Sequence, residues 1–237
     1  MAHATRNRVL LSLPLRTREA VLDECEEVEL QRRTILEEIG QPTRAVWFPE
    51  TSVISTLATY GDGSTIEMAN VGREACTGIN LVLHQPDQLN TNEVQIGGLA
   101  RRCPTERFLR LKAEDKAFSN ALFATVQAVF YQVMVSGACN GAHDSRQRLA
   151  RWLLTMDDRN DEAEMKLTHD FLGEILGLRR ATVTSAASSL QAEGLIAYSH
   201  GKVRITDRPG LREASCECYD LVRDAYESLL PEGRNAG

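Results

Sequence analysis

The chain has 237 residues, of which 43% are hydrophobic and 25% charged, and its formal net charge is −6. These values exclude disordered and fibrous proteins and leave room for one large domain or two small ones. The first residues, Met1 to Arg6, lack the apolar segment of a secretory signal, and no run of roughly 18 apolar residues suggests a membrane span. We therefore expect a cytoplasmic protein that has no membrane partner.

Positive charge gathers in one part of the chain. Residues 165–206 hold five basic and three acidic side chains, a net charge of +2, which leaves −8 for the remainder. Because salt screens charges beyond roughly 8–10 Å, this local excess governs an encounter with DNA more than the total charge does.

The six cysteines are scattered through a chain too large to need disulfides, and we expect free thiols in a reducing cytoplasm. Cys216 and Cys218 form the only close pair. On one helix, residues i and i+2 point to nearly opposite sides and chelate a single metal poorly. A structural role is therefore favoured over a redox or cluster role, and we predict no metal site and identify no cofactor.

Between residues 34 and 103 the chain is predicted to form short antiparallel strands. Runs rich in β-branched and aromatic side chains are separated by turn residues, and Gly61-Asp62-Gly63 suits a tight hairpin. The predicted strands are 34–36, 45–48, 53–60, 65–71 and 93–96.

A long helix is predicted next, because residues 108–136 contain no proline or glycine and carry an apolar stripe at helical spacing. The helix could pack on its own domain. We favour contact with the same helix of a second subunit, since Phe130 and Met134 widen the stripe beyond what one face needs. The predicted dimer-interface residues are Leu111, Phe118, Leu122, Val126, Val129 and Val133.

Small residues and two glycines at 136–141 predict a hinge, placed at residues 138–145. Asp144 is a candidate N-cap for a further amphipathic helix, which we expect to end before the polar run 157–162.

The segment from Leu167 predicts a helix-turn-helix followed by a wing. Thr168 is suited to cap a first helix, Gly177 supplies the turn, and a second helix is expected from about Arg180 to Ala192. Two alternating runs around His200-Gly201 then predict a hairpin.

The second helix is predicted to have an unusually small outer face. Val183, Ala187 and Leu190 fall together and should face the core, whereas the opposite side carries only alanine, serine and threonine. Such a face is either a plain polar surface or one that enters the major groove of DNA. We favour DNA, with base contacts from Arg180, Ala181, Thr184 and Ser185 and phosphate contacts from Thr168, His169, Arg179, Thr182 and Lys202.

The pattern L-T-(x)5-E-I-L-G-L-R-R-x-T-V-T from Leu167, followed by L-Q-A-E-G-L-I, resembles the DNA-binding domain of the Crp/Fnr transcription regulators. Weaker likeness lies in residues 46–50 and 71–74. The resemblance implies an α+β fold with a jelly-roll-like N-terminal β-roll. It divides the chain into a sensory β-roll domain (1–107), a long dimerisation helix (108–137), a hinge (138–145) and a winged helix-turn-helix domain (146–237).

Three departures from the family pattern bear on function. Cyclic-AMP-binding members carry a phosphate-pairing arginine soon after a Gly-Glu-Leu turn, but here residues 84–92 contain no arginine. Cluster-binding members carry a cysteine-rich N-terminus, whereas this chain has only Cys25 before Cys76. Of the Arg-Glu…Arg pattern on the recognition helix, only Arg180 matches, with Ala181 and Ser185 at the other places. We expect neither regulation by cyclic AMP nor the usual operator, and the effector stays unidentified.

The chain shows no phosphate-binding glycine loop, paired metal histidines or nucleophile elbow, so we expect no enzyme. The predicted function is a sequence-specific regulator that binds a two-fold DNA operator as a homodimer, with RNA polymerase as a partner if it activates transcription. The alternative is a cyclic-nucleotide-type sensory module that uses its winged helix to dock on proteins.

Overall fold

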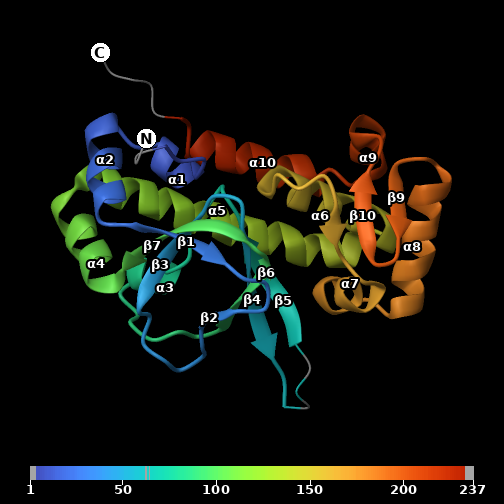
Figure 1. Cartoon of the computed structure of the whole chain (residues 1–237), viewed down its shortest axis with the longest axis horizontal. Helices are drawn as coiled ribbons and strands as arrows, with labels where there is room; N and C mark the ends of the chain where they lie inside the picture. The colour runs from blue at the N-terminus through green and yellow to red at the C-terminus, as the bar shows by residue number, and fades with distance from the viewer. Residues whose placement is uncertain (1–3, 62, 64, 233–237) are drawn as a thin grey trace.

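The computed structural model describes residues 4–61, 63 and 65–232 (Figure 1). The N-terminal half is built from α1 (Arg8–Leu11), α2 (Leu15–Asp23), β1 (Glu26–Leu30), β2 (Ile35–Glu37), β3 (Ala45–Pro49), β4 (Val53–Thr59), β5 (Thr65–Val71), α3 (Ile79–Val82), β6 (Thr91–Ile96) and β7 (Gly98–Pro104). Then follow α4 (Thr105–Glu114), α5 (Lys116–Ala142), α6 (Ser145–Arg159), β8 (Met165–Lys166), α7 (His169–Leu176), α8 (Arg180–Ala192), β9 (Ile196–Ser199), β10 (Lys202–Ile205), α9 (Arg208–Ala214) and α10 (Cys218–Leu229).

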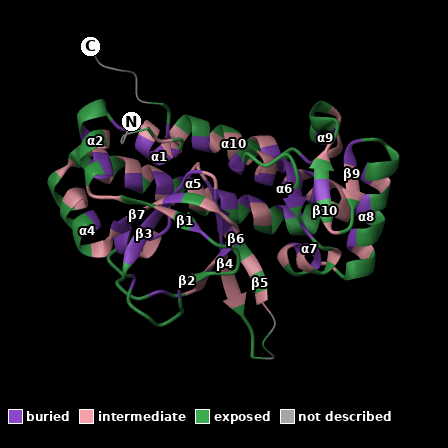
Figure 2. Cartoon of the chain, viewed as in Figure 1, coloured by how far each residue is buried: buried purple, intermediate pink, exposed green. Residues whose placement is uncertain are grey.

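Two antiparallel sheets form the N-terminal β-roll, in the strand orders β1-β7-β3 and β2-β6-β4-β5. All five predicted strands are present, and β4 and β5 form the predicted hairpin, although Asp62 of its turn lies outside the described residues. The prediction missed β1, because its Glu-rich sequence forms an edge strand with one buried residue, Leu30. Strand β3, by contrast, is buried along its whole length (Figure 2).

The predicted single helix over 108–136 is wrong in its continuity and its ends. Asp115 adopts an extended conformation that ends α4, and its side chain accepts a hydrogen bond from Phe118 N at 2.9 Å, which starts α5. The helix then runs through Gly137 and Gly141 to Ala142. Its last turns stay helical because Val135 and Cys139 are buried there.

The predicted hinge at 138–145 is therefore much shorter. The helical path breaks only at His143 and Asp144, and Asp144 caps α6 in a reciprocal hydrogen-bonded pair with Gln147. Helix α6 also continues through the first acids of the predicted polar run, as far as Arg159, which is buried.

Helix α5 has one face inside the subunit and one face outside it. Phe118 and Leu122 are fully buried in the subunit's own core, so their assignment to a dimer interface is wrong. The apolar side chains that α5 exposes are Phe123, Phe130, Val133 and Met134. Val126 and Val129 are half-buried against the same core. The error arose because α5 is apolar on nearly all sides, so spacing alone does not distinguish an inner from an outer stripe.

By length and composition, α5 is also the one helix among the described residues that could cross a membrane. A core helix of a soluble protein passes the same test. Here Gln132 of α5 is buried inside the fold, where its side-chain nitrogen donates to Asn70 O at 2.9 Å.

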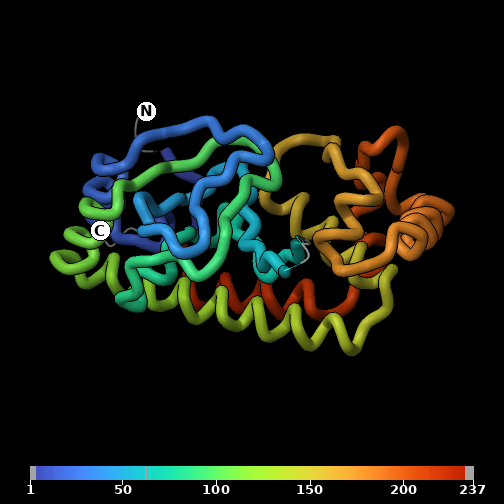
Figure 3. Tube along the Cα trace, turned by 90° about the horizontal axis from the view of Figure 1, so that it is seen from below, coloured from blue at the N-terminus to red at the C-terminus, as the bar shows by residue number. Residues whose placement is uncertain are grey.

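Most of the C-terminal helix α10 lies along α5, and only its start, at Tyr219, packs into the core of the winged helix (Figure 3). Tyr226 donates a 2.9 Å hydrogen bond to Gln132 Oε1, and Tyr226 and Leu230 are part of the N-terminal core. The chain thus leaves the N-terminal half at the end of α5 and returns to it at α10.

Candidate nucleic-acid interface

The two helices of the predicted helix-turn-helix, α7 and α8, are joined by a turn that only a few residue types fit. Thr168 caps α7 by accepting a hydrogen bond from Phe171 N at 3.2 Å, and Gly177 ends it with a φ of 61°. A Cβ on Gly173 would lie 2.8 Å from Leu178 O, so glycine is needed where the turn crosses α7. This part of the sequence prediction is confirmed to the residue.

Helix α8 separates its side chains as predicted. Val183, Ala187 and Leu190 are buried in the core of the winged helix, each at most 3% exposed. Figure 2 shows the alternation along α8. Arg180 and the predicted small residues are exposed, and Thr182 is half-buried; the exposed small residues are Ala181, Thr184, Ser185 and Ser188.

Arg180 stands at the start of α8 and faces the start of α7. Its Nη1 lies 3.2 Å from Asp170 Oδ2, and both side chains are about two-thirds exposed, at 68% and 66%. An ion pair this exposed contributes roughly 0–1 kcal/mol, so a phosphate or a guanine edge competes with it readily. Arg179 is the N-cap residue of α8 and is exposed beside it.

His169 and Thr184 connect the same two helices. Thr184 Oγ1 lies 2.9 Å from His169 Nδ1 and 3.0 Å from the carbonyl oxygen of Arg180. The His169 ring stacks on Tyr198 at a centroid distance of 4.4 Å. Burial, and then the Arg180 charge, lower the pKa of His169, which favours the neutral imidazole.

The wing is a three-stranded sheet in the order β8-β10-β9. Ser199 pairs with Lys202, and the two residues between them, His200 and Gly201, have φ values of 49° and 73°, as a tight type I′ hairpin requires. A Cβ on Gly201 would touch Thr168 at 3.4 Å, so the wing tip lies against the start of α7.

Lys202 has an acidic neighbour in this structure. Its Nζ lies 3.4 Å from Glu164 Oε2, with both side chains about half exposed. Sequence reasoning did not predict Asp170 or Glu164 as partners of Arg180 and Lys202. Asp170 lies ten residues before Arg180, and only the angle between α7 and α8 brings the two together.

The winged helix is held against the β-roll by a cluster of polar contacts at the end of α6. Buried Arg159 forms a salt bridge with Glu74, Nη2 to Oε1 at 2.6 Å, and Arg73 pairs with Asp161 at 2.9 Å. The Arg32 guanidinium lies 4.6 Å from the centre of the Phe171 ring. These contacts fix α7 and α8 relative to the β-roll.

A β-roll joined by a long helix to a winged helix-turn-helix defines a class of two-part DNA-binding regulators. Residues 147–214 match the Crp-like helix-turn-helix domain. The transcriptional regulatory protein btr of Bordetella pertussis is 30% identical over 115 residues, which is 46% of this chain and 42% of that protein. The matched stretch is thus less than half of the relative's length.

Solved structures show the same fold. FixK2 from Bradyrhizobium japonicum has a TM-score of 0.65 at 18% identity and covers 81% of this chain and 98% of its own. TTHB099, a CRP family regulator from Thermus thermophilus, has the same TM-score and identity, covering 79% and 96%. Together these matches show that the chain carries a Crp-like helix-turn-helix domain and has the fold of a CRP family regulator over about four fifths of its length.

Proposed function

We propose that this protein is a homodimeric, sequence-specific DNA-binding regulator that inserts α8 into the major groove. The observation that carries the proposal is the exposed face of α8, where small side chains follow two arginines at the helix start. Small side chains allow close approach of the backbone to base edges, and the arginines supply the long donors. The wing adds Lys202 as a phosphate contact.

The proposed dimer forms through the outer face of α5. Phe130 is 62% exposed, Phe123 and Met134 are 48% exposed, and water contact with such large apolar groups is unfavourable. A two-fold partner would cover the same face on both subunits. Two copies of α8 would then contact half-sites about one helical turn, roughly 34 Å, apart.

Cyclic AMP is not the proposed effector. Glu74, in the part of the β-roll that resembles the nucleotide-binding turn of relatives, is held by Arg159 and accepts a hydrogen bond from Gly72 N at 3.1 Å. A Cβ on Gly72 would collide with the Arg159 side chain, so this turn is already filled by protein. We expect isothermal titration calorimetry to show no cyclic-AMP binding; micromolar binding would overturn this part of the proposal.

Selection from a library of genomic fragments, followed by gel shifts at low and high salt, tests the DNA proposal. We expect a palindromic consensus and an affinity that falls steeply with salt, as phosphate contacts release counterions. Arg110→Ala removes a positive charge from α4, far from α8 in sequence. It is the charge-matched control for substitutions of Arg180 and should leave DNA binding unchanged. A winged helix that docks on proteins would give no specific shift.

The location proposed for this activity is the cytoplasm. If the regulator activates transcription, RNA polymerase is the expected second partner, and footprints next to promoters would identify that role.

A further inference from the structure

Four potential metal ligands meet where the chain leaves and re-enters the N-terminal half. One sulfur or nitrogen atom from each of Cys139, His143, Cys216 and Cys218 lies within 4.8 Å of every other. The three cysteines are buried and His143 is half-buried. Sequence reasoning assigned no metal to this chain, and nothing in the spacing of the four residues revealed their convergence.

Cys216 and Cys218 converge because they do not share a helix. Cys216 lies in the turn between α9 and α10, and Cys218 is the first residue of α10. Residues i and i+2 diverge only within one helix, so these two thiols are free to point toward the same place. Cys139 comes from the last turn of α5, and His143 is its C-cap residue.

The distances fit one ion better than a cluster. Cys139 Sγ and Cys216 Sγ are 3.5 Å apart, and Cys218 Sγ and His143 Nδ1 are 3.7 Å apart. Tetrahedral zinc with Zn–S bonds of roughly 2.3 Å and Zn–N bonds of roughly 2.0 Å requires ligand separations of roughly 3.5–3.8 Å. An iron–sulfur cluster places several iron and sulfide atoms between its cysteines and needs a wider cage.

The surroundings of the four side chains also suit a metal. The other ring nitrogen of His143, Nε2, lies 3.2 Å from Glu217 Oε2, the kind of carboxylate partner that orients a metal-bound imidazole. Thiolate is the form that binds metal.

We propose that Cys139, His143, Cys216 and Cys218 bind one thiophilic divalent ion, such as Zn²⁺, in a closed tetrahedral site. Three thiolates and a neutral imidazole give the occupied site a net charge of −1. Arg148 and Arg151 of α6 supply positive charge close enough to Cys139 to interact with it. With four protein ligands and no open position, the ion is structural.

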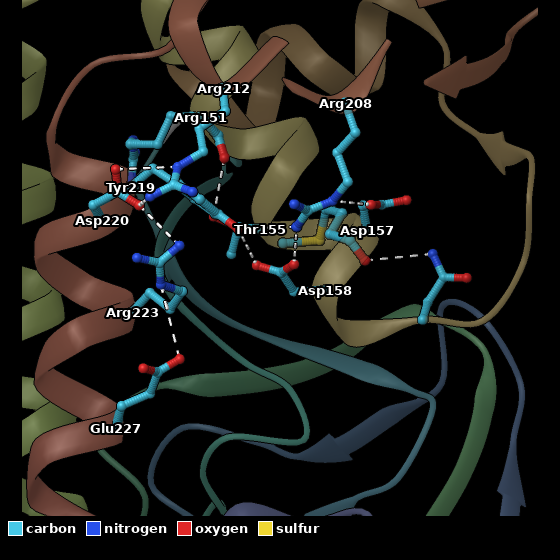
Figure 4. Close-up of polar contacts among 12 residues, drawn as sticks. Arg151, Thr155, Asp157, Asp158, Arg208, Arg212, Tyr219, Asp220, Arg223 and Glu227 are labelled. Atoms are coloured by element: carbon cyan, nitrogen blue, oxygen red, sulfur yellow. Dashed lines mark hydrogen bonds and ion pairs between the residues drawn. The ribbon is translucent and has the colours of Figure 1, made fainter. Parts of the chain in front are cut away.

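The bound ion would fasten the two chain crossings that connect the winged helix to the rest of the molecule. The first crossing is at residues 143–144, between α5 and α6, and the second at 215–217, between α9 and α10. Hydrogen bonds and ion pairs among side chains of α6, α9 and α10 already stabilise this region (Figure 4). Tyr219 donates to Asp158 at 2.7 Å, and Arg212 and Arg223 both pair with Asp220. Metal binding at this point would thus tie the end of α5 to the start of α10.

Titration of the full-length, thiol-reduced protein with Co²⁺ and Zn²⁺ tests the site. We expect one equivalent of Co²⁺ to give the intense visible absorption of tetrahedral thiolate coordination, and Zn²⁺ to displace it. Cys139→Ser, Cys216→Ser and His143→Ala should each weaken binding about 100-fold or more, while Cys25→Ser, a half-buried cysteine elsewhere, should leave it unchanged. Glu217→Gln, a positioning change, should weaken binding about 10-fold without altering the spectrum.

Two results would overturn the proposal. One is a reduced, folded protein that binds no Co²⁺, or binds it equally well after Cys139→Ser. The other is a Cys139–Cys216 disulfide in protein isolated without oxidant, detected by mass spectrometry after alkylation. Circular dichroism of each variant separates lost ligands from lost folding, and the His143→Ala variant, at a half-buried position, is the least disruptive of the set.

Discussion

In the described part of the chain, α5 and α8 each have an exposed face, and the chemistry of the two faces differs. The face of α5 is apolar and large, with Phe123, Phe130 and Met134 exposed. The face of α8 is small and hydroxylated, with arginine at one end. Covering large apolar groups with a similar surface lowers the free energy, whereas a face of small side chains beside cations suits a deep anionic groove. Exposure alone therefore does not define a partner; side-chain size and charge do.

The largest expected effect comes from charging the α5 face. Phe130→Glu would place two carboxylates at the proposed seam and should weaken dimerisation by about 3–5 kcal/mol, with loss of operator binding. Light scattering and fluorescence anisotropy measure the two losses. Leu89→Glu, at a 65% exposed leucine of the β-roll, is the matched control. An unchanged dimer in Phe130→Glu would show that α5 is not the seam.

Removing the long donor of the α8 face should have the next largest effect. Arg180→Ala is expected to cost about 1–3 kcal/mol on the selected operator and to relax the preference at one base pair of each half-site. Repeating the binding-site selection with the variant measures this directly. The same consensus at the same information content would mean that Arg180 contacts only phosphate and that the sequence is read through DNA shape.

Removing the acid that pairs with Arg180 should act in the opposite direction. Asp170→Asn frees Arg180 from a 3.2 Å ion pair and removes a negative charge near the groove face. Since an exposed pair is worth roughly 0–1 kcal/mol, we expect affinity for DNA to rise up to about five-fold. Anisotropy titrations at fixed salt measure the change, with Asp87→Asn in the β-roll as a control. Weaker binding would show that the pair positions Arg180 rather than restrains it.

The smallest effect is expected in the wing. Lys202→Ala should weaken all sequences alike and reduce the slope of log affinity against log salt by about one. Measurements at several salt concentrations on the operator and on an unrelated duplex decide this. A sequence-dependent loss would assign Lys202 a role in reading bases instead.

The winged helix was the most predictable part of the molecule, because its signals are local. The cap Thr168, the turn residue Gly177 and the period of Val183, Ala187 and Leu190 lie within a few residues of the structure that they specify. Capping residues and amphipathic patterns specify local structure that tertiary packing seldom overrides.

The parts that sequence reasoning missed depend on long-range packing. Which side of α5 is inner depends on its packing against the β-roll and against α10, whose sequence lies nearly a hundred residues away, and no local pattern encodes those pairings. The same holds for Arg159, which looks like one charge in a polar run but pairs with Glu74 in the β-roll. The break at Asp115 was a missed local signal, since aspartate is a common N-cap residue.

The return of α10 to the N-terminal core makes the winged helix an insertion between α5 and α10. The stretch that matches the Crp-like domain, 147–214, begins and ends within a few residues of the two crossings. His143 and Glu217, from the two crossings, lie 3.2 Å apart, so the ends of the insert are adjacent. A domain whose two ends are adjacent can be replaced by another domain without disturbing the fold into which it is inserted. The β-roll, α5 and α10 therefore form a continuous unit that could carry a different DNA-binding domain, provided that the surface of the new domain fits against Glu74 and Val53.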